Sequence, residues 1–170
     1  MRPAGADFVW SDTLGFVVTR TGRLLVTRAT CDYPYLFRIL AEWLKTWWPV
    51  EKRFVFTSIN LNANYAARAH RDGNNCGPSI LKALGEFQGG WLRYWGQDDG
   101  RLQFGALLKC QADLLNTRDG LCLFDGRHQI SLCVLFCRSI ALACCVWVLR
   151  PGVCDVTPRF PLQHNTFFAR

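Results

Sequence analysis

The sequence lacks the cysteine spacing of a zinc ribbon. It contains nine cysteines, but none of them form a C-x-x-C pair. Cys144 and Cys145 are adjacent, which is poor geometry for two ligands of one metal ion. Residues 1–8 also lack the apolar core of a signal peptide. We therefore expect an intracellular protein, in the cytoplasm or the nucleus, with reduced thiols.

The sequence also lacks a dense basic run, an internal repeat and a low-complexity linker. Its formal net charge is +7 and its pI is about 9.1, yet the Lys and Arg residues are scattered. Scattered positive charge is typical of a soluble basic surface. It also permits a nucleic acid or another anionic partner, without indicating one.

Hydrophobic and aromatic residues, by contrast, are abundant. Half of the 170 residues are hydrophobic, and seven Trp and twelve Phe are present. This composition favours a sheet-rich core over a thin helical bundle. The length fits one domain, so we expect a single domain over residues 1–170, with residues 129–170 as a divergent tail.

The hydrophobic pattern predicts strands around one helix. Apolar residues spaced three and four apart predict an amphipathic helix over residues 32–48, with Pro34 near its start and Pro49 after its end. Residues 79–87 fit a strand or a helix equally well. Runs of strand-forming residues between turns predict the strands, at residues 8–26 (two strands), 54–61, 62–69, 91–95 and 121–124.

Residues 130–149 form an almost wholly apolar segment that would just span a bilayer. Arg138 lies near its centre, where a charge costs about 2.5 kcal/mol or more in a membrane. A membrane anchor is therefore the weaker interpretation of this segment.

The residues with the clearest chemical meaning are His70 and Asp72, which form an H-x-D motif at the predicted end of a strand. Residues two apart on a strand lie on one face, so both side chains can reach one metal ion. One imidazole and one carboxylate are two of the three ligands in a facial triad for non-haem Fe(II). An H-x-D alone is weak, since Asp72 could instead pair with Arg71 on the surface.

The segment around this motif resembles a subset of the 2-oxoglutarate- and Fe(II)-dependent oxygenases. The subset has the pattern R-x-H-x-D-x-N-N-x-G-x-S, preceded by an N-x-N-Y-like strand and followed by G-G-x-L and D-G motifs. The matching residues here are Asn62, Asn64, Tyr65, Arg68, His70, Asp72, Asn74, Asn75, Gly77, Ser79, Gly85, Phe87, Gly89, Gly90, Leu92, Leu123, Phe124, Asp125 and Gly126. The resemblance implies a mainly β fold with a flanking helix. Its core would be a double-stranded β-helix, or jelly roll, either complete or lacking part of its last strands.

The resemblance implies an iron ligated by His70, Asp72 and a third, distal histidine. His128 is the expected third ligand, although family members place this histidine closer to position 130. His164 is the alternative, if residues 130–161 are an insertion. The sequence contains no other histidine.

The resemblance also implies 2-oxoglutarate as co-substrate. Arg138 is expected to hold its distal carboxylate, because a guanidinium suits a carboxylate. Asn62 and Tyr65 are expected to donate hydrogen bonds to the other end of the co-substrate.

Three hypotheses follow. The chain is an oxygenase that hydroxylates a substrate while 2-oxoglutarate is decarboxylated to succinate, or a non-catalytic barrel that has lost part of the site, or a protein anchored through residues 130–149. The substrate class stays open between small molecules, protein side chains and nucleobases.

Overall fold

A computed structural model of the protein describes residues 8–47, 54–73, 75, 77–102, 106–107, 111–132, 135–136, 139–145 and 167–168. The helices are α1 (Arg28–Asp32) and α2 (Pro34–Trp47). The strands are β1 (Trp10–Val18), β2 (Leu24–Val26), β3 (Ser58–Ala63), β4 (Ala67–His70), β5 (Pro78–Gly85), β6 (Gln88–Gly89), β7 (Trp91–Tyr94), β8 (Asp113–Asn116), β9 (Leu121–Asp125), β10 (Ile130–Leu132), β11 (Leu135–Phe136), β12 (Ser139–Cys145) and β13 (Phe167–Phe168).

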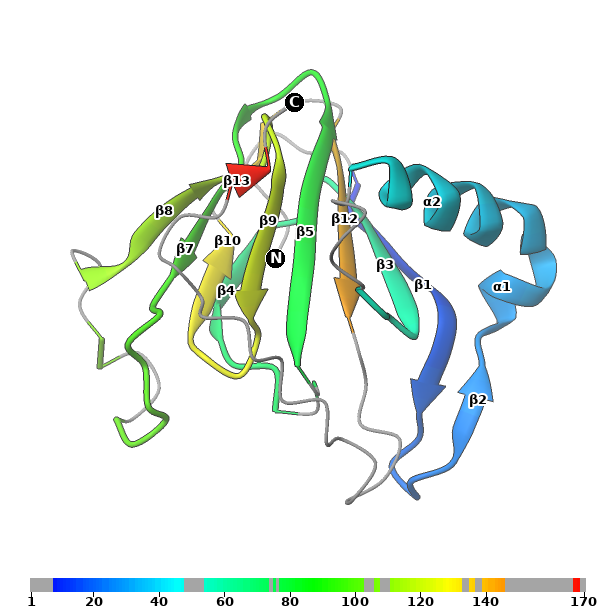
Figure 1. Ribbon diagram of the computed structural model, residues 1–170, viewed down its shortest axis with the longest axis horizontal. Helices are drawn as coiled ribbons and strands as arrows, with labels where there is room; N and C mark the ends of the chain where they lie inside the picture. Colours follow the sequence, from blue (N-terminus) through cyan, green and yellow to red (C-terminus); the bar gives the residue numbers. More distant parts are fainter. Residues whose placement is uncertain are drawn as a thin grey trace.

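The strands form two main antiparallel sheets that face each other (Figure 1). The larger sheet has the order β13-β9-β5-β12-β3-β1-β2, and the smaller one the order β4-β10-β7-β8. Strands β6 and β11 form a separate pair. The four strands β9-β5-β12-β3 lie opposite the four strands of the smaller sheet, as in a double-stranded β-helix. The predicted fold class is confirmed, and all eight core strands are present among the described residues.

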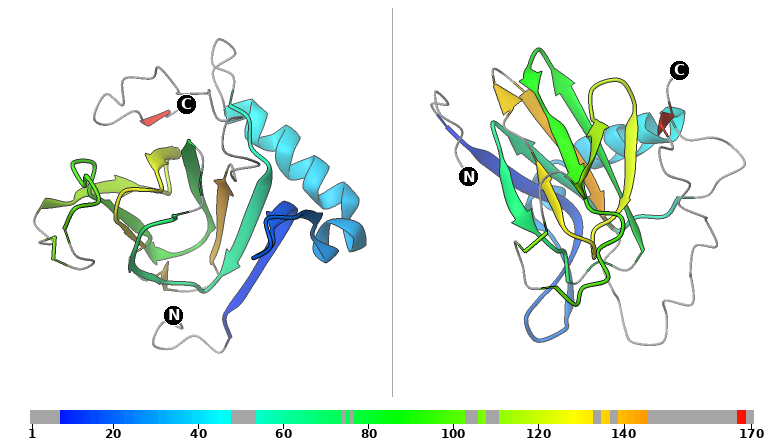
Figure 2. Two further views of the ribbon diagram at one scale, coloured as in Figure 1. Left: turned by 90° about the horizontal axis from the view of Figure 1, so that it is seen from below. Right: turned by 90° about the vertical axis from the view of Figure 1, so that its left-hand side faces the viewer.

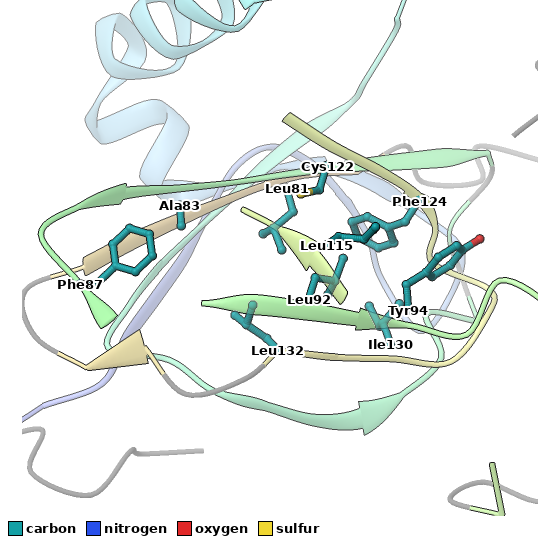
Figure 3. Close-up of a cluster of buried hydrophobic side chains, with 10 residues drawn as sticks. All are labelled: Leu81, Ala83, Phe87, Leu92, Tyr94, Leu115, Cys122, Phe124, Ile130 and Leu132. Atoms are coloured by element: carbon teal, nitrogen blue, oxygen red, sulfur yellow. The ribbon is translucent and has the colours of Figure 1, made fainter. Parts of the chain in front are cut away.

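Buried side chains from both sheets fill the space between them (Figure 3). Leu81 of β5 and Phe124 of β9 belong to the same cluster as Leu92 of β7 and Ile130 of β10. The other buried members are Ala83, Phe87, Tyr94, Leu115, Cys122 and Leu132. Neither sheet can bury its apolar face alone, so this shared core holds the sheets together.

The larger sheet is also covered on its outer face. Ile80 and Leu121 point away from the interior and join a second buried cluster with Leu44 of α2. Figure 2 shows α2 lying along this side of the sheet. A strand buried on both faces has no polar–apolar alternation. This is why residues 79–87 fit a strand or a helix from sequence, whereas the structure has β5 there.

The helix predicted over residues 32–48 is α2, and the short helix α1, which was not predicted, precedes it. The side chain of Thr27 caps α1 by accepting a hydrogen bond from the backbone N–H of Thr30. Tyr33 separates the helices, with φ −130° and ψ 58°. A proline disfavours the helical conformation in the residue before it, which here is Tyr33. The second helix, α2, therefore begins at Pro34. The prediction that a helix packs on the outer face is confirmed by α2.

The described parts of the apolar segment 130–149 are strands. β10 lies between β4 and β7, and β12 lies between β5 and β3. A strand in the interior of a sheet that is covered on both faces is typically a continuous apolar run, and β12 lies in the interior of the larger sheet. Within the described part of the chain, no helix is long and apolar enough to cross a bilayer.

Candidate metal centre

His70 and Asp72 lie together at the end of β4. His70 Nε2 is 3.4 Å from Asp72 Oδ1, and both residues line one pocket. The other ring nitrogen, Nδ1, lies 2.7 Å from the carbonyl oxygen of Arg68, which fixes the ring orientation. The hydrogen bond with Asp72 raises the pKa of His70 above its ordinary value, against the opposing effect of burial. The pair therefore has the placement that two ligands of one ion need, and its role as a metal site stays a prediction.

Two hydrogen bonds fix the position of Asp72, and a third orients the residue that makes one of them. Its backbone N–H donates to the carbonyl oxygen of Gly126 at 2.7 Å. Its Oδ2 accepts a hydrogen bond from the amide of Asn75 at 3.1 Å, and the same amide nitrogen lies 3.1 Å from Ser79 Oγ. Asn75, Ser79 and Gly126 belong to the N-N-x-G-x-S and D-G motifs, so residues of both motifs orient one carboxylate.

Gly126 leaves space here for two polar side chains. A Cβ at this position would lie 2.8 Å from Asn75 Nδ2 and 2.9 Å from Asp72 Oδ2. Gly126 is the glycine of the D-G motif. The structure shows that this glycine lets the backbone approach the carboxylate of the H-x-D motif.

Arg71 pairs with Asp98, and the surface pairing with Asp72 considered from sequence is wrong. Arg71 Nε and Nη2 each donate to the Asp98 carboxylate at 2.6 Å. Asp98 also accepts from the backbone N–H of Gln129 at 2.6 Å and of Gly100 at 3.0 Å. The Arg71 guanidinium lowers the pKa of Asp98 to about 2. Asp98 therefore ties the H-x-D segment to the residue preceding β10, and none of the sequence motifs singled it out.

The pocket has a volume of about 480 Å³, within the usual range of about 300–1,000 Å³ for a small-molecule site. Asn62 and Tyr65, the predicted co-substrate residues, line it together with His70 and Asp72. Further polar lining comes from Ser11, Thr13, Ser58 and Asn60. The apolar lining comes from Ala67, Leu81, Leu92, Phe124, Ile130 and Leu132. The pocket thus has a polar wall on β1 and β3, apolar walls from the core, and the His–Asp pair.

The predicted third ligand, His128, is not brought to this pair. Its Nδ1 lies 2.9 Å from Tyr94 Oη, and its ring stacks on that of Tyr94 with centroids 5.7 Å apart. Across the part of the chain that the structure describes, no three His, Cys, Asp or Glu side chains are grouped so that they could hold one metal ion. His128 follows β9 and lies two residues before β10, the strand that pairs with β4 beside His70. This offset places the His128 ring against Tyr94 and away from His70.

Ile130, and not His128, is the residue of this segment that faces His70. It lies directly opposite His70 where β10 pairs with β4, and it lines the same pocket. The described residues therefore fit a metal ion with two protein ligands, and do not fit one with three. The other predicted site residues, Arg138 and the alternative ligand His164, lie outside the described residues.

No family model and no curated protein matches the sequence, but solved structures match the fold. NgTET1, solved in complex with 5mC DNA, aligns with a TM-score of 0.55 at 15% identity, over 82% of this chain and 61% of NgTET1. An oxidoreductase of the 2OG-Fe(II) oxygenase family from Burkholderia pseudomallei aligns with a TM-score of 0.54 at 12% identity, over 85% of this chain and 71% of that one. This chain, which spans about three fifths of the length of NgTET1, has the double-stranded β-helix fold of the 2OG-Fe(II) oxygenases.

Proposed function

We propose that the pocket binds Fe(II) and 2-oxoglutarate, and that the protein is a 2-oxoglutarate-dependent dioxygenase that hydroxylates an unidentified substrate. The observation that carries the proposal is the pairing of His70 Nε2 and Asp72 Oδ1 at 3.4 Å, inside a pocket of the fold that such oxygenases share. When bound, iron would supply the activation of O₂ that is coupled to decarboxylation of 2-oxoglutarate to succinate.

The protein's own residues would position the reactants. His70 and Asp72 would hold the ion, with Asn75 and Gly126 orienting the carboxylate. Asn62 would donate a hydrogen bond to the co-substrate, with Tyr65 beside it. The apolar lining would keep bulk water away from the reacting centre.

The co-substrate 2-oxoglutarate carries two carboxylates, so its binding site needs positive charge. Arg71 is the cation among the described lining residues, and its guanidinium is engaged by Asp98 through two hydrogen bonds. A dicarboxylate needs a second positive group at its distal end. Arg138 is our proposal for that group, because it directly precedes β12, a strand that pairs with β3 of the pocket wall.

A nucleobase in DNA is the first substrate class to test. NgTET1 was solved in complex with 5mC DNA, and the net charge of +7 would attract a polyanion. A protein side chain or a small molecule would be the substrate if DNA produces no increase in succinate formation.

The experiment is a succinate assay with Fe(II), ascorbate and 2-oxoglutarate, followed by addition of DNA. We expect slow uncoupled turnover by the wild-type protein, which His70→Ala and Asp72→Ala should each abolish. His128→Ala is the matched control. It should keep turnover, because its ring is engaged with Tyr94 outside the His–Asp pair. Absence of succinate from a folded protein would refute oxygenase activity.

A non-catalytic binding barrel is the second candidate, and Ile130 favours it. With two ligands in the described site, an ion would be held loosely. Calorimetric titration with 2-oxoglutarate separates the two functions, because a binding protein would bind the co-substrate without forming succinate.

A further inference from the structure

We propose that Ile130 occupies the third-ligand position of the His70–Asp72 site, and that this one side chain leaves the described residues with weak, two-ligand binding of divalent metal ions. The inference rests on the proposed function in so far as it takes the His–Asp pair to be a metal site. It goes further by naming the residue that sets metal affinity.

The register of the smaller sheet singles out position 130. Ile130 is the direct partner of His70 in the antiparallel pairing of β10 with β4. Side chains of directly opposed residues lie on one face of a sheet, with Cβ atoms about 4.5–5.5 Å apart. Imidazole nitrogens bind metal ions at about 2 Å. A ligand at position 130 could therefore reach an ion held by His70.

The position of Asp72 agrees with this geometry. Asp72 approaches His70 Nε2 from the segment after β4, and its backbone N–H bonds to Gly126 at the turn that leads to β10. The two proposed ligands and position 130 thus border one part of the pocket, and all three residues line it.

Neighbouring positions do not offer the same approach. Leu132 also lines the pocket from β10, but its partner across the strand pair is Ala67 at the far end of β4. The ring of His128 is engaged with Tyr94. Position 130 is therefore where β10 would contribute a ligand.

The isoleucine side chain at position 130 cannot act as a metal ligand and excludes any other ligand from this position. Ile130 is 6% exposed and packs in the core cluster with Leu92, Tyr94 and Phe124. An isoleucine has no lone pair to donate and shields that side of the ion site from water. A histidine of similar bulk would keep most of this packing, and a bound metal ion would satisfy its buried nitrogen.

Co(II) without 2-oxoglutarate is the probe for the test, because its affinity and absorption spectrum report the ligands directly. Ile130→His should raise Co(II) affinity by roughly tenfold or more over the wild-type protein. Adding His70→Ala to this variant should remove the gain. Leu132→His is the matched control on the same strand and should give no comparable gain.

A second variant covers the case in which the histidine does not fit the core. Ile130→Cys is smaller, and its thiolate would give a sulfur-to-cobalt absorption band that Leu132→Cys and the wild-type protein lack. The proposal is overturned if folded variants at position 130 show neither the affinity gain nor the band. It is also overturned if the gain survives loss of His70.

These outcomes are distinct from failure of the proposed function. Succinate formation by the wild-type protein tests the oxygenase proposal and uses no variant at position 130. Co(II) binding tests position 130 and requires no turnover. A wild-type protein that already binds Co(II) as tightly as Ile130→His would refute the present inference, whatever its oxygenase activity.

Discussion

At the scale of single residues, the site depends on how closely the backbone of Gly126 approaches Asp72. A side chain at position 126 would collide with the Asp72 carboxylate and with the Asn75 amide that orients it, at 2.9 and 2.8 Å. Contacts of this length do not occur without displacement of one partner. The metal affinity that we propose for the site should therefore be sensitive to a residue that has no ligand atom.

Gly126→Ala should weaken Co(II) binding by roughly tenfold, in the range found for loss of a residue that orients a metal ligand. The physical reason is displacement of Asp72, so the fold should be retained and His70 should be unaffected. Calorimetric titration with Co(II) measures the change. Gly73→Ala is the matched control, because a Cβ there has nothing within 4 Å. Equal affinities for the two variants would contradict the role of Gly126.

Asp98 is the second residue for which we make a specific prediction, which concerns the pH dependence of stability. Its buried carboxylate binds Arg71, and the pKa lies near 2 instead of the ordinary 3.8. A shift of this size corresponds to about 2 kcal/mol of stability. A lowered pKa stabilises the folded state above the unfolded pKa, and this contribution is lost as the pH falls through the folded value. Asp98→Asn should therefore cost about 2 kcal/mol at neutral pH, with the difference from wild type shrinking below about pH 4.

Urea denaturation at several pH values measures this difference. Asp99→Asn is the control, because the Asp99 side chain is 57% exposed and its ion pair with Arg101 lies in solvent. Exposed pairs contribute about 0–1 kcal/mol. A cost for Asp98→Asn that does not change with pH would show that its carboxylate charge contributes nothing to stability.

At the scale of elements, α2 stabilises the barrel from outside. Leu44 is 5% exposed and belongs to the outer cluster with Ile59 and Ile80, whereas Ile39 on the same helix is 63% exposed. Leu44→Ala should therefore lower the free energy of unfolding by about 2–5 kcal/mol. Ile39→Ala should change it by less than about 0.5 kcal/mol. Similar losses for the two variants in chemical denaturation would mean that α2 is not packed as described.

The elements also show which parts of the fold and of the site could be predicted from the sequence, and why the other parts could not. Periodicity gave the α2 helix, because one of its faces is apolar. It failed for β5, since Ile80 and Leu81 are buried on opposite faces and leave no alternation. The H-x-D spacing predicted that His70 and Asp72 share a pocket, and this holds because residues two apart in the chain stay close, although Asp72 lies just beyond the end of β4. The offset of His128 from His70 is set by the pairing of β10 with β4, and no local pattern encodes that register.

At the scale of the whole molecule, strands from the C-terminal third of the chain complete the barrel. The strands β10 and β12 come from the C-terminal third, yet each lies in the interior of its sheet with a partner on both sides. β12 pairs with both β3 and β5, and β10 pairs with both β4 and β7. Neither sheet is continuous until these strands are added, so residues 129–170, expected from sequence to be a divergent tail, include strands that the core requires.

A chain that ends at residue 129 should therefore fail to fold. It would lack β10 and β12, leaving β3, β4, β5 and β7 with unpaired edges and the interior cluster without Ile130 and Leu132. A chain that ends at residue 145 is the matched control. Of the described elements it loses only β13, which pairs with β9 at the edge of the larger sheet. We expect a cooperative urea transition and dispersed amide resonances for the chain ending at 145, and neither for the chain ending at 129. A folded, cooperative chain of residues 1–129 would show that the barrel does not depend on its two late strands. The pocket would then lack the strand that carries Ile130, and His70 would have no strand opposite it from which any third ligand could come.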